Sequence, residues 1–175
     1  MKRIGLMSTM AVLAVFAVTG CTVQPLYNQQ TASIADQPAA LRSVEVAQVD
    51  SRVGVELRNR LIFLLNGGEG QPESPRYRLS VQVTSQSSSA LVLQQSSRDG
   101  EPSKRDVSVA ANYTLRNIED DSIVTTRRVS VTASFDVSQQ EFGNVRAERD
   151  AENRAAREAA EQIHALLAAD LSRTE

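Results

Sequence analysis

Three stretches of this chain alternate apolar and polar side chains, and this pattern constrains the fold more than any other feature. The apolar positions are odd-numbered throughout: Tyr77, Leu79, Val81 and Val83, then Val107, Val109, Ala111, Tyr113 and Leu115, then Val129, Val131, Ala133, Phe135 and Val137. A period of two is typical of a β-strand with one buried face and one face in water. The sequence therefore predicts a sheet that is covered on one side only.

The numbering of these stretches also predicts how the last two strands pair. Antiparallel neighbours that face one core must oppose residues of the same face, so the numbers of paired residues sum to an even value. The loop around Glu119-Asp120-Asp121 must then hold an odd number of residues, unless a bulge intervenes. This register places Tyr113 near Arg127 and Asn112 near Arg128. Arg127 falls on the apolar face, and we expect its guanidinium to reach water at the end of the sheet, over the Tyr113 ring.

Two further segments show the spacing of three and four residues that is typical of amphipathic helices. The first begins at the N-cap residues Asp50 and Ser51, ends at Asn66-Gly67-Gly68, and carries the apolar stripe Val53, Leu57, Leu61, Leu64 and Leu65. The second runs from Phe142 to Leu171, with dense charge in its first half and an apolar face in its second half. Such a charged run is most often a solvated helix face; the alternative is a surface that meets a partner.

Two segments give weaker patterns. Residues 41–49 predict a short strand around Val44, Val46 and Val49. Within residues 85–105, Ala90-Leu91-Val92-Leu93 is compatible with a strand, whereas Ser87-Ser88-Ser89 favours a loop.

The elements together predict an α+β fold: a four-stranded mixed sheet with two helices packed on one face, in the order β-α-β-β-β-α. The composition supports a folded domain, because 41% hydrophobic and 23% charged residues are ordinary values for globular proteins. We predict one α+β domain over residues 41–172.

The N-terminal residues are predicted to direct export. Lys2 and Arg3 precede an apolar run over residues 4–18, which is too short for a confident membrane span. The junction Val18-Thr19-Gly20-Cys21 resembles the bacterial lipobox, in which the cysteine is acylated. The alternative is a plain signal peptide that ends near a cysteine. We therefore predict a lipoprotein signal peptide over residues 1–20, lipidation at Cys21 and a tether over residues 21–40. An aspartate directly after the lipidated cysteine would indicate retention in the inner membrane. Thr22 occupies this position, which favours the outer membrane.

The sequence shows few residues that could carry chemistry. One cysteine and one histidine exclude an internal disulfide and a multi-histidine metal site. No Gly-x-Ser-x-Gly elbow is present, and Gly67-Gly68-Glu69-Gly70 follows a helix, whereas phosphate-binding glycines precede one. His164 is interpreted as an ordinary helix histidine. We expect no enzyme activity, no catalytic residue, no metal and no cofactor. A net charge of -2 and only 4% aromatic residues argue against nucleic acid as a partner.

The polar face of the sheet is the remaining candidate site. Arg76 and Arg78 of the first alternating strand share this face with Arg116 and Arg128 of the next two strands, if all strands join one sheet. Guanidinium groups bind phosphates and carboxylates through two parallel hydrogen bonds. The alternative is an ordinary solvated sheet face.

A series of short motifs gives the chain a family resemblance. In order along the chain these are Cys21 with Pro25-Leu26-Tyr27, Leu57-Arg58-Asn59-Arg60-Leu61, Tyr77-Arg78-Leu79, Ala111-Asn112-Tyr113-Thr114-Leu115, and Phe135 leading through Gln139-Gln140-Glu141-Phe142 into Arg146-Ala147-Glu148-Arg149-Asp150-Ala151. The chain thus resembles the LPS-assembly lipoprotein (LptE) family in its alphaproteobacterial form. The resemblance implies a four-stranded sheet with two helices on one side, which agrees with the predicted fold.

The resemblance also implies a role. Members of this family act as a plug and assembly partner of the LptD-type β-barrel that inserts lipopolysaccharide (LPS), and they contact LPS. We accordingly expect a lipid-anchored protein on the periplasmic side of the outer membrane. Its expected partners are the barrel, LPS and the membrane, and its LPS-binding candidates are Arg76, Arg78, Arg116 and Arg128.

Two other interpretations stay open at this point. Periplasmic adaptor lipoproteins of ABC-type lipid transport systems also combine a lipobox with a small α/β domain. They use an aromatic docking groove, for which the few aromatic residues of this chain offer little. A purely structural envelope lipoprotein is the third interpretation.

Overall fold

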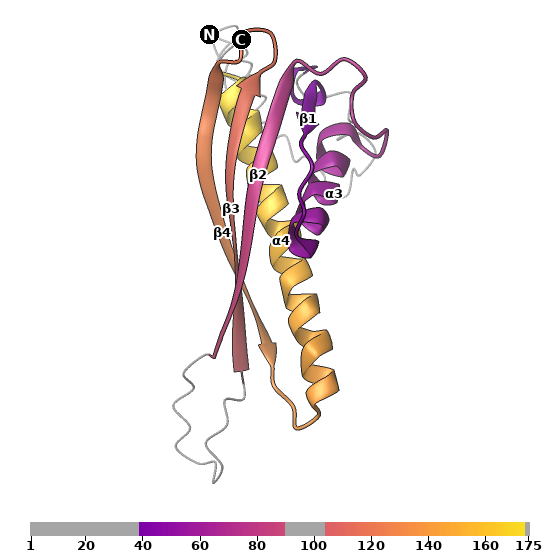
Figure 1. The fold of residues 1–175 in the computed structure, drawn as a ribbon, viewed down its shortest axis with the longest axis vertical. Coiled ribbons are helices and arrows are strands. Elements are labelled where there is room, and N and C mark those ends of the chain that lie inside the picture. Colours follow the sequence, from indigo (N-terminus) through magenta and orange to yellow (C-terminus); the bar gives the residue numbers. More distant parts are fainter. Residues whose placement is uncertain (1–38, 90–103, 174–175) are drawn as a thin grey trace, which may run out of the picture. The chain divides into compact units, whose positions relative to one another are not determined.

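The computed structural model describes residues 39–89 and 104–173, which lie within one compact unit. Its elements are α2 (Ala39–Arg42), β1 (Val44–Val46), α3 (Arg52–Asn66), β2 (Tyr77–Ser89), β3 (Lys104–Asn117), β4 (Ile123–Asp136) and α4 (Glu141–Leu171), shown in Figure 1. The strands form one sheet in the order β1-β2-β3-β4, with β1 parallel to β2 and the other pairs antiparallel. The predicted fold class is confirmed. The short helix α2 was not predicted, because four residues are too few to show a helical period.

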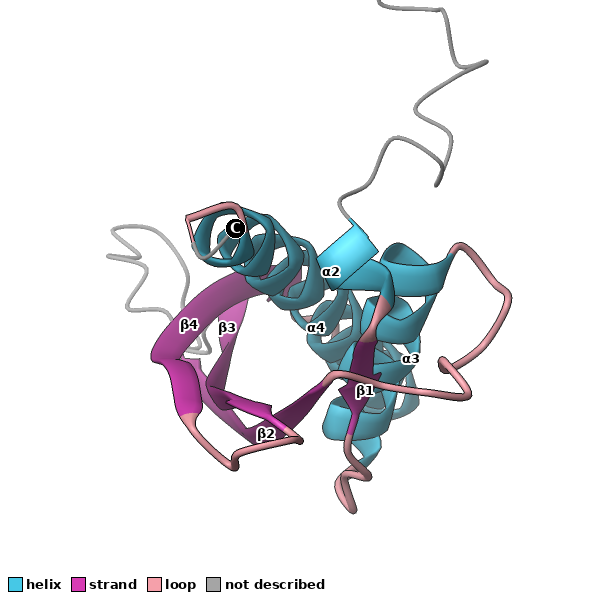
Figure 2. Cartoon of the chain, turned by 90° about the horizontal axis from the view of Figure 1, so that it is seen from above, coloured by secondary structure: helices cyan, strands magenta, loops and turns pink. Residues whose placement is uncertain are grey.

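Both long helices pack on the same face of the sheet (Figure 2). Helix α4 covers β3 and β4, and α3 covers β1 and β2. The odd-numbered side chains of the three long strands point toward the helices, and those of Leu79, Val107 and Leu115 have no exposed surface. Ala155 and Ala159 of α4 are equally buried, so small side chains bring this helix close to the strands. We call this covered side the inner face and the opposite side the outer face.

The register of β3 and β4 confirms the prediction from residue parity. Tyr113 lies opposite Arg127 and Asn112 opposite Arg128, and the connection over residues 118–122 holds five residues. A bulge interrupts the ladder near this connection: Leu115 pairs with Thr125, but the next residue, Arg116, pairs with Ile123. The numbers of paired residues therefore sum to an even value from Lys104 to Leu115. The bulge shifts the last pair, Arg116 with Ile123, by one residue.

Helix α3 begins and ends as the sequence indicates. The Ser51 hydroxyl accepts a hydrogen bond from the Gly54 amide, at 3.1 Å, and Gly67 ends the helix in the left-handed conformation, with φ at 60°. A Cβ atom on Gly54 would lie 2.3 Å from a methyl carbon of Val49. Val49 thus packs against the first turn of α3 and is not part of β1, which ends at Val46. The expectation of a strand around Val49 was wrong at this residue.

Strand β2 extends further than predicted. Ser85 to Ser89 continue the strand and pair with residues 105–109 of β3, so the loop expected at Ser87-Ser88-Ser89 was wrong. The hydroxyl-rich sequence gives no apolar alternation, and the strand is held there by its backbone pairing with β3. The tetrapeptide Ala90-Leu91-Val92-Leu93 lies outside the described residues, as do Cys21 and residues 22–38 of the predicted tether.

Three ion pairs join the two long helices. Arg52 pairs with Glu152, Glu56 with Arg157, and Arg60 with Glu161, the last two at 2.7 Å. Part of the dense charge of α4 therefore binds α3 within the domain. The remaining charged residues at the start of α4, such as Arg146 and Arg149, are exposed.

Candidate functional site

No described helix covers the outer face of the sheet. Its side chains come from alternate positions of four strands: Glu45 of β1, then Arg78, Ser80, Gln82, Thr84, Gln86 and Ser88 of β2, then Lys104, Asp106, Ser108, Ala110, Asn112, Thr114 and Arg116 of β3, then Thr126, Arg128, Ser130, Thr132, Ser134 and Asp136 of β4. Hydroxyl and amide side chains dominate the middle of this face. Charged side chains lie mainly toward its two ends.

Arg78 and Arg116 form the centre of the candidate site. They are direct register partners on neighbouring strands, so two guanidinium groups start from adjacent positions of the outer face. Like charges in this arrangement repel each other. Each has an acidic neighbour: Arg78 contacts the Glu45 carboxylate at 3.3 Å, and Arg116 donates to the Asp121 backbone oxygen at 3.0 Å, with the Asp121 carboxylate at 3.4 Å.

The other two predicted arginines lie at different positions. Arg76 precedes β2; its carbonyl accepts a hydrogen bond from the Ile118 amide, and its guanidinium lies 5.6 Å from the centre of the Tyr77 ring. Arg128 lies opposite Asn112, four residues along β3 from Arg116, which corresponds to about 14 Å. The structure therefore places Arg78 and Arg116 at one end of the outer face, Arg76 just before β2 against the Tyr77 ring, and Arg128 farther along the outer face.

This arrangement can bind an anionic group. The side chains of Arg78 and Arg116 are 55% and 43% exposed, so their ion pairs are worth only about 0–1 kcal/mol each. A phosphate that accepts bidentate hydrogen bonds from both guanidiniums can replace these weak contacts and relieve the repulsion between the two cations.

Arg127 binds the domain's own C-terminal helix. Its guanidinium donates to both carboxylate oxygens of Asp170, at 2.8 and 2.7 Å. The side chain is 40% exposed to water, as expected. Its partner is the Asp170 carboxylate, which strand patterns alone could not identify, and the cation–π contacts of the described residues do not include the one expected with the Tyr113 ring. The Arg127 hydrogen bond holds the pKa of Asp170 below its ordinary value. Burial raises the pKa of the neighbouring Tyr113 to about 12.

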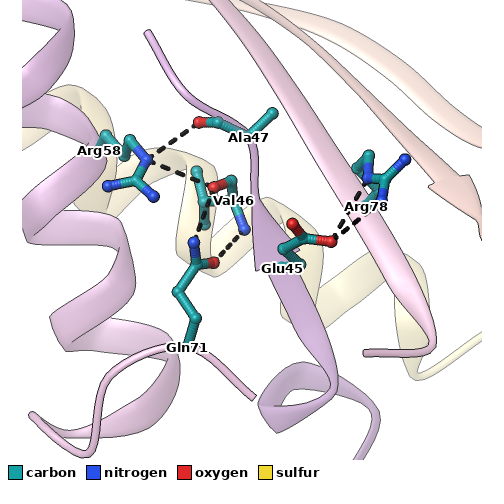
Figure 3. A network of polar contacts seen from close by, with 6 residues as sticks. All are labelled: Glu45, Val46, Ala47, Arg58, Gln71 and Arg78. Atoms are coloured by element: carbon teal, nitrogen blue, oxygen red, sulfur yellow. Dashed lines mark hydrogen bonds and ion pairs between the residues drawn. The ribbon is translucent and has the colours of Figure 1, made fainter. Parts of the chain in front are cut away.

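Polar side chains close the outer edge of β1 (Figure 3). The Gln71 amide accepts a hydrogen bond from the Val46 amide at 2.6 Å and donates to the Val46 carbonyl at 3.1 Å. Arg58 donates to the Val46 and Ala47 carbonyls, at 3.3 and 3.0 Å. Gln71 thus substitutes for a neighbouring strand. Sequence reasoning missed this contact, because no local pattern links Gln71 to a strand 25 residues away.

The described part of the chain shows no arrangement typical of a catalytic centre. It contains no group of three or more residues suited to hold a metal ion. His164 is partly buried, and burial lowers its pKa, as for an ordinary helix histidine. A cavity of about 500 Å³ near the end of α3 is lined by residues that include Arg42, Asn66 and Glu73, without a nucleophile paired to a base. Over these same residues no helix is long and apolar enough to cross a membrane.

Comparison with known proteins identifies the family. The model of the LptE lipopolysaccharide-assembly family matches residues 40–167, which is most of the chain. The chain belongs to the LptE family. The resemblance in the short sequence motifs is therefore confirmed. Members of the LptE family are envelope lipoproteins of LPS assembly. No curated protein sequence matches the chain.

Solved structures share the LptE-type fold. A lipoprotein from Caulobacter crescentus CB15 has 24% sequence identity and a TM-score of 0.61, over 78% of this chain and 95% of that chain. A minor lipoprotein from Acinetobacter baumannii has 14% identity and a TM-score of 0.53, over 73% and 89% of the two chains. Rare lipoprotein B from Shewanella oneidensis has 9% identity and a TM-score of 0.54, over 75% and 97%. At these identities the likeness shows a common fold.

The LptE motif Leu57-Arg58-Asn59-Arg60-Leu61 has a structural role in this chain. Leu57 and Leu61 are fully buried beneath the sheet. Arg58 binds the carbonyls of β1, and Arg60 pairs with Glu161 of α4. This motif therefore fixes the position of α3, and the candidate binding residues lie on the opposite face of the sheet.

Proposed function

We propose that this protein is a lipid-anchored outer-membrane partner of the LptD-type barrel, acting as its plug and assembly factor in LPS insertion. In this proposal Cys21 carries the acyl chains, residues 21–40 form the tether, and the protein faces the periplasm. The protein acts by binding and performs no enzymatic reaction. Membership of the LptE family over residues 40–167 is the observation that carries the proposal.

The chemistry of the outer face supports a place inside a barrel. Side chains that line the lumen of an outer-membrane barrel are polar. The outer face presents hydroxyl and amide groups along three long strands, and its one buried apolar side chain is Ala110, at 8% exposure, among the described residues. Such a face can exchange hydrogen bonds with water for hydrogen bonds with a polar wall.

The arginines supply a candidate contact with LPS, whose lipid A carries phosphates. We assign this contact to Arg76, Arg78 and Arg116, with Arg128 farther along the same face. Their exposed guanidiniums leave an approach for a ligand, since the ion pairs of Arg78 and Arg116 lie at the surface.

Co-purification tests the barrel partner. The full-length lipoprotein, tagged at its C-terminus and extracted from membranes in mild detergent, should recover a large β-barrel in stoichiometric amount. Mass spectrometry of the N-terminal peptide should show acyl groups on Cys21. Recovery of an inner-membrane transporter without a barrel would reject the proposal in favour of an adaptor role.

A charge-reversal variant tests the LPS contact. Replacing Arg76, Arg78, Arg116 and Arg128 with Glu should weaken binding to purified LPS by about tenfold or more, because four phosphate-binding cations become anions. The circular dichroism spectrum should stay that of the folded protein, since these side chains contribute little to the core. A matched control replaces Arg146 and Arg149 with Glu. Both residues are exposed on α4, which does not contribute to the outer face. Unchanged LPS binding by the four-site variant would reject the assignment.

A further inference from the structure

One edge of the sheet is open along most of β2. Strand β1 pairs only with Tyr77 to Leu79, so ten of the thirteen residues of β2 lie beyond it. The carbonyl of Leu79 points toward β1 and accepts a hydrogen bond from the Ala47 amide. Because backbone groups alternate sides along a strand, those of Val83, Ser85 and Ser87 point to the same edge. Among the described residues, no strand pairing or backbone hydrogen bond joins these groups to another strand or loop.

Parts of the rest of the sheet perimeter are protected. The outer edge of β1 is closed by the side chains of Gln71 and Arg58 (Figure 3). On the far edge, Arg154 of α4 donates to the Ser134 carbonyl of β4, at 3.0 Å. That edge also carries the charged residues Arg127 and Arg128 and the bulge near Ile123. Bulges and charged residues are the devices by which natural sheets prevent pairing with another chain.

The open stretch of β2 has no bulge and no charged residue of its own, and its one side-chain hydrogen bond to a helix is the one that the Ser85 hydroxyl donates to the Glu152 carboxylate of α4, at 3.0 Å, among the described residues. Residues 80–89 read Ser-Val-Gln-Val-Thr-Ser-Gln-Ser-Ser-Ser, without a charged residue or a proline. From Thr84 to Ser89 every side chain is exposed, on both faces. Among the described residues, this uncharged and unpaired stretch is therefore suited to accept a strand.

We propose that the edge of β2 from Val83 to Ser87 pairs with an extended backbone segment of the barrel partner, which adds a strand to the sheet. This inference rests on the proposed function, since the barrel supplies the segment. The edge adjoins the outer face, so one partner can cover both. A second copy of the chain fits less well: edge pairing over so few residues buries far less than the roughly 1,200 Å² that a stable protein–protein interface requires.

Residue-resolved amide hydrogen exchange tests the proposal on the full-length lipoprotein, free and in the purified barrel complex. The amides of Val83, Ser85 and Ser87 should exchange rapidly in the free protein and about tenfold or more slowly in the complex. Amides that already pair with β3, such as those of Thr84 and Gln86, serve as internal references for global unfolding.

The other outcomes overturn the proposal in distinguishable ways. If the complex forms and the three amides still exchange rapidly, the edge is not used, although the proposed function stands. If no complex with the barrel forms, both proposals fail. Protection in the free protein that grows with its concentration would assign the edge to a second copy. Protection in the free protein at every concentration would assign it to another segment of the same chain.

A pair of proline variants gives an independent test. In S87P the proline removes an amide hydrogen that points to the open edge, so no hydrogen bond to β3 is lost. The matched control is S130P, at an exposed edge position of β4, where the amide also points away from β3. Both variants should keep the circular dichroism spectrum of the folded protein. S87P should recover about tenfold less barrel than S130P; equal recovery by two folded variants would contradict the proposal.

Discussion

The two faces of the sheet are built from the same strands, and adjacent residues along one strand serve opposite purposes. Leu79 of β2 is fully buried on the inner face, whereas its neighbour Ser80 is exposed on the outer face. The inner face contacts two helices of the same chain, whereas no helix of the described residues covers the outer face. The difference indicates that the inner face determines stability and that the outer face is available for partners. Four variants test this separation, in order of decreasing expected difference from the wild type in the free energy of unfolding, each at the pH where that difference is largest.

The largest loss is expected for L79A. Removing a fully buried leucine side chain leaves a cavity between β2 and the helices, and the free energy of unfolding should fall by about 2–5 kcal/mol. The matched control is S80A, because Ser80 is the next residue along β2 and lies on the outer face. This control should change the free energy of unfolding by less than about 0.5 kcal/mol. Urea denaturation followed by circular dichroism measures both. Similar losses in the two variants would show that the faces do not differ as described.

Tyr113 should make the inner face sensitive to alkaline pH. Burial raises its pKa to about 12 from 10.0, so its contribution is fully present below pH 10 and is lost as pH rises toward 12. A difference of two pKa units corresponds to about 2–3 kcal/mol, of which about half is lost by pH 11. The variant Y113F removes this loss, and unfolding free energies measured between pH 8 and 11 should decline less steeply than in the wild type.

The hydroxyl of Tyr113 has no hydrogen-bond partner among the described residues. Y113F should therefore be as stable as the wild type, or slightly more stable, at pH 7. A large loss of stability in Y113F at pH 7 would show that the hydroxyl is bonded in solution.

D170N should have an intermediate effect. The Asp170 side chain is only 9% exposed and binds Arg127 through two hydrogen bonds, so its loss should cost about 1 kcal/mol at pH 7. Because Arg127 lowers the pKa of Asp170, this contribution is present above about pH 4 and is lost as pH falls through the lowered pKa. The variant should then lose less stability than the wild type on acidification.

The control for D170N is D150N on the same helix. Asp150 is 68% exposed and pairs with Arg154 four residues along α4, so the variant should change stability by less than about 0.5 kcal/mol. Thermal unfolding at pH 3 and pH 7 distinguishes the two carboxylates. Equal effects of D170N and D150N at pH 7 would contradict the structural role of Asp170.

R116Q should have the smallest effect on folding. The change removes an exposed ion pair with Asp121 and also removes the repulsion from Arg78 across the strand pair, and these two effects oppose each other. We expect a change in the free energy of unfolding of less than about 0.5 kcal/mol. A loss above 1 kcal/mol would place Arg116 among the residues that hold the fold together.

Much of the fold could be predicted because each long strand follows its own alternation. Residue parity together with the place of the loop around Glu119-Asp120-Asp121 predicted the pairing of Tyr113 with Arg127: parity excludes shifts of one residue, which would expose a whole apolar set, and the loop excludes larger shifts. The extension of β2 through Ser89 could not be predicted, because it depends on hydrogen bonds to β3 and not on side-chain pattern. Helix α2 was not predicted, because its four residues are too few to show a helical period.

The candidate site was predicted in part. The strand faces of Arg78, Arg116 and Arg128 followed from parity, and the structure adds that Arg78 and Arg116 are direct partners. Their carboxylate neighbours could not be found from the sequence, because Glu45 lies on a strand whose position beside β2 is fixed only by the tertiary fold. The open edge of β2 likewise could not be predicted, because it depends on the strand order and on the short length of β1.

The ion pairs between α3 and α4 join residues about a hundred positions apart. A chain that emerges from the ribosome or from an export channel, N-terminus first, exposes the leucines of α3 long before residues 152–161 arrive to cover them. The contacts between α3 and α4 can therefore form only after almost the whole domain has been synthesised, so the apolar stripe of α3 must stay without its final cover until then.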